Sequence, residues 1–133
     1  MNDQNKQYQE ALDYLYSYID FSLVKAFRYA PEEFDLGRMH DLVNRMGNPQ
    51  NAYEVIHIAG SKGKGSTASF IVNALITAGY KVGLYSSPHL QEFTERIQVN
   101  NQEIPKADFI RLVNKIKEFI LPESKLTTFE LAT

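Results

Sequence analysis

The stretch VIHIAGSKGKGST, residues 55–67, decides the fold of this chain. It begins as an apolar run of strand length, breaks at Gly60, Gly63 and Gly65, and resumes as a helical pattern. Glycine permits backbone angles and close approaches that a Cβ would obstruct. Backbone N–H groups at the start of a helix can point at a polyphosphate, where the helix dipole also favours negative charge. The stretch therefore predicts a phosphate-binding loop between a strand and a helix.

The side chains of this loop suit the same ligand. Lys64 supplies a mobile positive charge that can reach the outer phosphates, and Ser66 or Thr67 can offer a hydroxyl to a phosphate or a magnesium ion. The general pattern G-x-x-x-x-G-K-[ST] is not matched, because Ile58 stands at the first glycine position and Gly65 follows the lysine. The alternative interpretation is a glycine-rich turn that binds nothing.

Composition limits the class of protein. The 133 residues fit one modest domain, and 14 Lys and Arg against 16 Asp and Glu give a net charge of −2 that does not suggest a nucleic-acid partner. The absence of cysteine excludes disulfides and Cys-ligated zinc. Neither a membrane-length apolar run nor a signal peptide is present, so we expect a soluble, cytoplasmic protein that does not bind membranes.

The first fifty residues predict a helical lead-in. Residues 7–20 carry apolar side chains at helical spacing: Tyr8, Ala11, Leu12, Leu15, Tyr16 and Ile19. A second helix is predicted with Asp35 as its N-cap and an end at Gly47-Asn48-Pro49. Its expected buried face consists of Leu36, Met39, Leu42, Val43 and Met46.

The central part of the chain predicts a strand, helix, strand unit. Residues 53–59 and 81–86 are the expected parallel strands, and the helix between them carries apolar residues up to Ala78 and is closed by Gly79. The apolar residues of this helix are Ala68, Phe70, Ile71, Ala74, Leu75 and Ala78. The crossover should be right-handed, and ligands should gather at the carboxyl ends of the strands, where Ser86 and Ser87 lie.

The last third of the chain predicts a hairpin and two helices. Asn100-Asn101 forms the tight turn between strands 96–99 and 103–104, because asparagine tolerates positive φ. A helix opens at residues 105–108 and extends to about residue 120, and Thr127 or Thr128 caps the start of another. The apolar face of the longer helix is Phe109, Ile110, Leu112, Val113, Ile116, Phe119 and Ile120.

Four segments in order resemble the folylpolyglutamate synthase/dihydrofolate synthase family of the Mur ligase superfamily. They are the loop G-[ST]-x-G-K-G-[ST], the segment 79–90, Glu95-Arg96-Ile97 with its hairpin, and the segment 126–130. The resemblance spans about residues 8–133. Asp35-Leu36-Gly37 followed by Arg38 is also similar to the family's segment before the first strand, but the usual Leu-Glu-Arg spacing differs, so no role is carried over to Arg38.

The resemblance implies an α/β fold with a P-loop NTPase-like, mostly parallel sheet flanked by helices, here an incomplete part of a Mur ligase-type ATPase domain. Residues 1–50 would be the helical lead-in, 53–87 the strand, loop, helix and strand, 88–104 a mobile loop and hairpin, and 105–133 a helix and the start of the next. The family's C-terminal domain would lie outside this chain.

The resemblance also implies site residues. The ATP phosphates would contact Ser61, Lys62, Gly63, Lys64, Gly65 and Ser66. Lys64 would be catalytic and Ser87 a magnesium ligand. The pocket for the pterin-bearing substrate would be bordered by Thr127, Thr128, Phe129 and Glu130. Without the resemblance, Ser87 would be read as the start of a turn, Glu130 as a first-turn carboxylate and His89 as a surface or packing residue.

The implied reaction is the ATP-dependent addition of L-glutamate to a folate through an acyl phosphate, with ATP as substrate and Mg²⁺ as cofactor. Dihydrofolate synthase, which adds glutamate to dihydropteroate, is the alternative enzyme. A non-catalytic nucleotide-binding module is the alternative from another class. We expect an N-terminal fragment that does not catalyse ligation alone and that self-associates through exposed strand edges and apolar surface.

Overall fold

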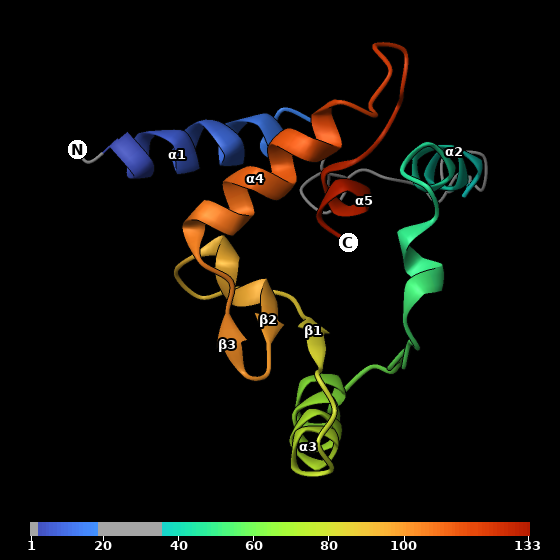
Figure 1. The fold of residues 1–133 in the computed structure, drawn as a ribbon, viewed down its shortest axis with the longest axis vertical. Helices are drawn as coiled ribbons and strands as arrows, with labels where there is room; N and C mark the ends of the chain where they lie inside the picture. Colours follow the sequence, from blue (N-terminus) through green and yellow to red (C-terminus); the bar gives the residue numbers. More distant parts are fainter. Residues whose placement is uncertain (1–2, 19–35) are drawn as a thin grey trace. The chain divides into compact units, whose positions relative to one another are not determined.

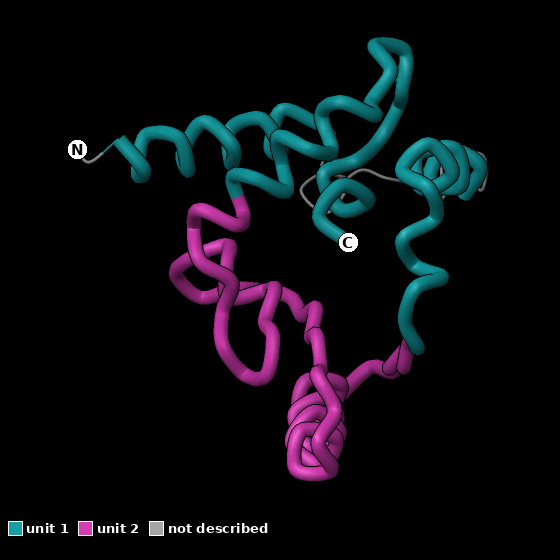
Figure 2. Tube along the Cα trace, viewed as in Figure 1, with its two compact units in different colours: residues 1–54, 110–133 teal, residues 55–109 magenta. Residues whose placement is uncertain are grey.

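The computed structural model of the chain describes residues 3–18 and 36–133, so the predictions for Ile19 and Asp35 lie outside the described residues. The chain divides into two compact units, which Figure 2 distinguishes by colour. Unit 1 comprises Met1–Glu54 and Ile110–Thr133, and unit 2 comprises Val55–Phe109. Each unit is described by itself below.

Helices make up unit 1 (Figure 1). They are α1 (Asp3–Tyr16), α2 (Gly37–Arg45), the 3-10 turn Pro49–Ala52, the C-terminal part of α4 (Lys106–Lys117), and α5 (Thr128–Ala132). Helix α1 begins four residues before the predicted start at residue 7, because Asp3 accepts a hydrogen bond from Gln7 (3.0 Å) and its carboxylate favours the helix N-terminus.

Helix α2 confirms the predicted end but only part of the predicted face. Gly47 (φ 82°) and Asn48 (φ 55°) adopt the left-handed conformation that stops the helix. Leu42 is buried, as expected, whereas Leu36 is 68% exposed. Leu36 precedes the first helical turn as the N-cap, so the helical spacing that places Leu42 toward the core does not govern it.

The buried apolar residues of unit 1 come from helices far apart in the sequence. They are Tyr8, Ala11, Leu15, Leu42, Val113, Leu126 and Leu131. A polar contact joins α1 to α5, since the Thr128 hydroxyl donates to the carbonyl oxygens of Leu15 (3.0 Å) and Tyr18 (2.9 Å). At the same, C-terminal end of α1, the Lys117 ammonium of α4 lies 4.2 Å from the centroid of the Tyr14 ring.

Unit 2 contains α3 (Lys64–Thr77) and a three-stranded sheet. Strands β1 (Gly83–Tyr85), β2 (Ile97–Val99) and β3 (Gln102–Glu103) follow in the order β1-β2-β3, and both pairings are antiparallel. The predicted hairpin turn is confirmed, because Asn100 (φ 51°) and Asn101 (φ 62°) both have positive φ. The Asn100 side chain also accepts a hydrogen bond from the Val82 N–H (2.9 Å), which ties the turn to β1.

The predicted parallel sheet is wrong for the described residues. Residues 54–60 form no strand, and β1 pairs with the hairpin strand β2 instead of with them. A segment forms a strand only when its backbone hydrogen-bonds to a neighbouring strand. Strand β1 finds that partner in β2, because closing the loop between two strands so near in the sequence costs little entropy. No described strand pairs with 54–60, and accordingly Val55 and Ile56 are 67% and 59% exposed.

Helices α3 and α4 both form where the sequence predicted them. They differ from the prediction in which residues of α3 are buried and in where α4 ends. Gly79 (φ 90°) follows the end of α3 as predicted, but Phe70 is 78% exposed and Val72 is the buried residue of this helix. Without a parallel sheet in unit 2, the apolar face expected for α3 has no layer to cover it. Helix α4 buries Phe109 and Val113, as predicted, and ends at Lys117 instead of at about residue 120.

Candidate functional site

The glycine-rich loop leads directly into α3. Gly63 is the N-cap of the helix in the left-handed conformation (φ 74°), and Gly60 has a φ of 151° that a side-chain-bearing residue rarely adopts. Gly65 already lies in the helix, and a Cβ there would meet nothing within 4 Å. The backbone angles at Gly60 and Gly63 therefore require glycine. Gly65 has no side chain to cover the loop surface.

The start of α3 offers donors to an anion. The first hydrogen bond of the helix runs from the Thr67 N–H to the Gly63 carbonyl (2.9 Å), so the N–H groups of Lys64, Gly65 and Ser66 have no acceptor within the helix. All three residues are exposed. These amides and the positive end of the helix dipole suit a phosphate group.

Lys64 is the first residue of α3, and its side chain folds back over the loop. Its Nζ donates to the Gly60 carbonyl oxygen at 2.7 Å. The ammonium group is thereby held on the loop side of the helix start, close to the exposed amides. Lys62, also predicted to bind ATP, is exposed on the same loop.

Ser87 lies in unit 2, in the segment that follows β1. Ser87 is exposed. Within residues 3–18 and 36–133, no three or more His, Cys, Asp or Glu side chains gather as a metal site. A magnesium ion here would need phosphate oxygens and water beside a hydroxyl ligand, which is the way Mg²⁺ is commonly held at nucleotides.

The loop after Ser87 is organised by one carboxylate. Glu95 accepts hydrogen bonds from the N–H groups of Leu90, Gln91 and Glu92, each at 2.7 Å. The pKa of the Glu95 carboxyl is lowered by these backbone donors, that of Leu90 first. Of the surface or packing roles expected for His89, the structure shows packing, because its Nδ1 accepts from Arg96 Nε (2.7 Å) and its ring lies 5.7 Å, centroid to centroid, from that of Phe93.

The predicted folate segment forms the start of α5 in unit 1. Thr127 is the N-cap: its Oγ1 accepts from the Glu130 N–H (3.1 Å), and Glu130 in turn accepts from the Thr127 N–H (2.8 Å). This reciprocal pair is a capping box. Thr128 is buried, whereas Phe129 is 63% exposed. Of the two cap residues that the sequence allowed, Thr127 is the one used.

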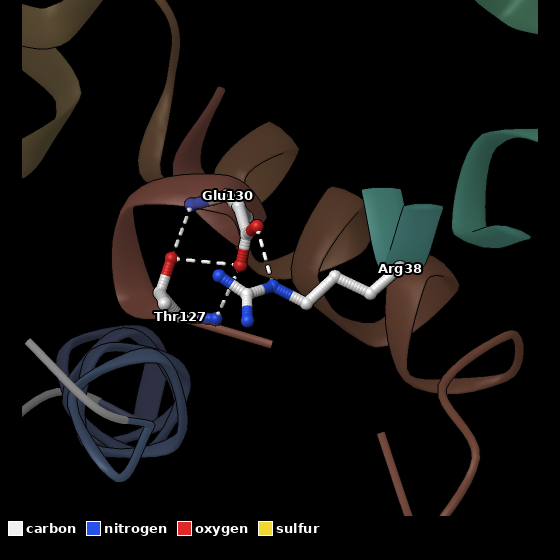
Figure 3. Close-up of polar contacts among 3 residues, drawn as sticks. All are labelled: Arg38, Thr127 and Glu130. Atoms are coloured by element: carbon white, nitrogen blue, oxygen red, sulfur yellow. Dashed lines mark hydrogen bonds and ion pairs between the residues drawn. The ribbon is translucent and has the colours of Figure 1, made fainter. Parts of the chain in front are cut away.

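An ion pair at this segment was missed by sequence reasoning. Arg38 Nε of α2 donates to Glu130 Oε1 at 2.7 Å, with the two side chains 21% and 14% exposed (Figure 3). The residues are 92 positions apart, and a single sequence carries no signal for a contact at that separation. The basic residue after Gly37 was noticed, but its spacing gave no reason to assign it a role.

The candidate residues fall into two groups. The glycine-rich loop and Ser87 belong to unit 2, and the segment 127–130 belongs to unit 1 together with Arg38. Within unit 1, the capping box joins Thr127 to Glu130, and Glu130 also pairs with Arg38. The fold and these features define an α/β segment with a glycine-rich, lysine-bearing loop at a helix start.

Comparison with known proteins gives the family. The dihydrofolate synthase/folylpolyglutamate synthase of Bacillus subtilis is 36% identical over 113 residues, which are 85% of this chain and 24% of that protein. Folylpolyglutamate synthetase from Lactobacillus casei matches with a TM-score of 0.79 and 32% identity over 93% of this chain and 30% of that one. A solved FPGS–AMPPCP–folate complex matches with the same TM-score and identity over the same shares of the two chains. No protein-family model matches the chain.

The chain belongs to the folylpolyglutamate synthase/dihydrofolate synthase family. It spans about a quarter of the length of the curated relatives it matches. Among residues 3–18 and 36–133, no helix combines the length and the apolar character that a membrane span requires.

Proposed function

We propose that this chain supplies the nucleotide loop and part of the acceptor site of an ATP-dependent ligase that adds L-glutamate to folates. The observation that carries the proposal is the loop geometry: a left-handed glycine caps α3, three helix-start amides are open, and Lys64 lies over the loop. The names of the relatives support the substrate class, since one solved relative is a complex with AMPPCP and folate.

The proposed nucleotide site consists of Ser61, Lys62, Gly63, Lys64, Gly65 and Ser66. The exposed amides of this loop bind the polyphosphate, and the Lys64 ammonium leaves the Gly60 carbonyl for the outer phosphates. Lys64 then stabilises the charge on the phosphoryl group as it moves to a carboxylate of the folate. Ser87 would hold Mg²⁺, which supplies further charge neutralisation when it is bound.

The proposed acceptor site uses the segment Thr127, Thr128, Phe129 and Glu130. The exposed ring of Phe129 offers an aromatic face for the pterin, while its neighbours in the segment are held by hydrogen bonds. In the reaction, the γ-phosphoryl group of ATP passes to the folate carboxylate, ADP leaves, and the amine of glutamate attacks the acyl phosphate. The products are the amide, ADP and phosphate.

The second candidate function is dihydrofolate synthesis. It is favoured by a yeast dihydrofolate synthetase that is 36% identical over 102 residues, and by the double name of the Bacillus relative. Assays of the proposed ligase that contains this chain, with dihydropteroate and with tetrahydrofolate as acceptors, distinguish the two functions. Glutamate transfer only to dihydropteroate would overturn the first proposal in favour of the second.

We propose that the 133-residue chain by itself does not catalyse ligation, because it matches a quarter or less of the length of the curated relatives. The expected result is nucleotide binding without ATP- and glutamate-dependent lengthening of a folate. Any such lengthening by the purified chain would contradict this expectation.

A further inference from the structure

Glu130 joins two elements of unit 1, the short helix α5 and helix α2. Its Oε1 accepts from Arg38 Nε of α2 (2.7 Å), and its Oε2 accepts from the backbone N–H (2.8 Å) and the hydroxyl (2.9 Å) of Thr127. Figure 3 shows the Arg38 side chain extended from α2 to this carboxylate. Both carboxylate oxygens are therefore occupied, one by the helix cap and the other by the guanidinium.

Helix α5 depends on these contacts for its geometry. It has five residues, far fewer than an isolated helix needs to persist in water. On one side the Thr128 hydroxyl is fixed to α1 through the carbonyls of Leu15 and Tyr18. On the other side Glu130 is fixed to α2 through Arg38. A charge-assisted hydrogen bond between two mostly buried side chains is among the stronger contacts available to such a short helix.

In the sequence, Phe129 lies between Thr128 and Glu130, the two residues whose side chains are held by these contacts. Its ring is 63% exposed, in contrast to the buried Thr128 before it and the mostly covered carboxylate of Glu130 after it. The backbone on both sides of the ring is thus held by α1 and α2, and the direction in which the ring emerges is set by those contacts. A preformed aromatic surface binds a flat ligand without the entropy cost of ordering it first.

We propose that Arg38 is a positioning residue for the folate site: through Glu130 it holds the start of α5 so that Phe129 presents its ring to the pterin. This inference rests on the proposed function of the segment 127–130. Arg38 does not touch the ligand, and its effect passes through the Glu130 carboxylate.

The test uses variants that separate the ion pair from the helix cap. Arg38→Ala removes the guanidinium. Glu130→Gln removes the charge but keeps an oxygen that can accept from the Thr127 N–H, because glutamine also serves at this capping-box position. Arg38→Lys restores a positive charge, and Arg45→Ala removes another arginine from α2 as the matched control.

The measurements are calorimetric titrations of folate and of Mg-ATP into the whole chain and each variant, with hydrogen exchange of residues 127–131. We expect Arg38→Ala and Glu130→Gln each to weaken folate binding by about tenfold, and the double variant to be no weaker than either. Arg38→Lys should recover most of the loss. Arg45→Ala should bind folate as the unaltered chain does, and Mg-ATP binding should be the same in all variants.

The possible failures are distinguishable. If the unaltered chain binds folate and Arg38→Ala binds it equally well, the positioning role is overturned while the proposed folate site stands. If the losses of Arg38→Ala and Glu130→Gln add in the double variant, Arg38 does not act through Glu130, and the inference is also overturned. If the unaltered chain binds Mg-ATP but no folate, the proposed folate site falls, and this inference falls with it.

Discussion

The glycines of the loop at residues 60–66 have different structural roles, although they stand close together in the sequence. Gly60 and Gly63 adopt φ values of 151° and 74°, which only glycine adopts readily. Gly65 has no such requirement and faces open space inside the first turn of α3. The conformational freedom of glycine is therefore needed at Gly60 and Gly63, whereas the fold itself does not require glycine at position 65.

Substitutions at Gly63 and Gly65 should change stability in opposite directions. Alanine at position 63 must adopt the left-handed conformation, which costs about 1–2 kcal/mol. Alanine at position 65 replaces a helical glycine and should stabilise by up to about 1 kcal/mol, while its methyl group crowds a bound phosphate. Urea denaturation of the two variants checks this, and a shift of both midpoints in the same direction would contradict it.

The Glu95 carboxylate should make its loop sensitive to acid. Its folded-state pKa is lowered by the N–H groups of Leu90, Glu92 and Gln91, so it stabilises the loop at pH values above the pKa of the unfolded chain. That contribution is lost as the pH falls through the lower, folded-state pKa. Amide resonances of residues 90–92 should shift together with the Glu95 carboxyl resonance on acidification. Glu95→Gln should abolish this common transition, and an unchanged transition in that variant would refute the assignment.

At the scale of single residues, the sequence predicted those features that depend only on residues close to each other in the chain. The spacing of Gly60, Gly63 and Lys64 predicted a loop at a helix start, because those residues act on a few consecutive peptide units. The pair between Arg38 and Glu130 could not be predicted, since it depends on how α2 and α5 pack. Two opposite charges 92 positions apart have many alternative partners in one sequence.

Among the helices and strands, too, the features with local causes were predicted and those with non-local causes were not. The hairpin of β2 and β3 and the cap of α5 were predicted, because Asn100-Asn101 and Thr127 act on the adjacent backbone. The strand expected at 53–59 is absent, because an apolar run becomes a strand only beside another strand. Apolar pattern alone indicates that a segment could pair, without indicating its partner.

The hairpin turn gives a prediction for its element. Asn101→Ala should destabilise the hairpin by about 1 kcal/mol, because alanine tolerates φ near 62° less well than asparagine does. Asn101→Gly should be tolerated, since glycine adopts that conformation without a Cβ clash, although it loses the hydrogen bond from Asn101 Nδ2 to Asn73 Oδ1 (2.9 Å). Hydrogen exchange of the residue 97–104 amides measures both effects. Equal protection in the alanine and glycine variants would show that the backbone conformation is not the cause.

For the molecule as a whole, the unit that carries the phosphate loop leaves apolar side chains exposed. Val55, Ile56, Phe70 and Tyr80 of unit 2 are each more than half exposed. The expected parallel sheet would have buried Val55 and Ile56. These two side chains are exposed because the predicted strand does not form. Family membership was nevertheless predictable, because the diagnostic motifs are local and do not require the sheet.

Exposed apolar surface of this kind should cause self-association of the 133-residue chain. We expect the mass measured by light scattering to rise with protein concentration, and Phe70→Ser to reduce that rise. The control is Leu121→Ser, because Leu121 is 45% exposed and belongs to unit 1. Leu42→Ser would not serve as a control, because Leu42 is buried. A constant monomer mass over a hundredfold range of concentration would contradict the expectation.

The central claim is that the loop at residues 60–67 binds a nucleoside triphosphate, and calorimetric titration of Mg-ATP into the chain tests it most directly. Lys64→Ala is the variant, and Lys81→Ala, an exposed lysine of unit 2 outside the loop, is the control. The account predicts binding by the unaltered chain and by Lys81→Ala, and its loss in Lys64→Ala. Equal binding by all three chains, or no binding by the unaltered chain, would contradict it.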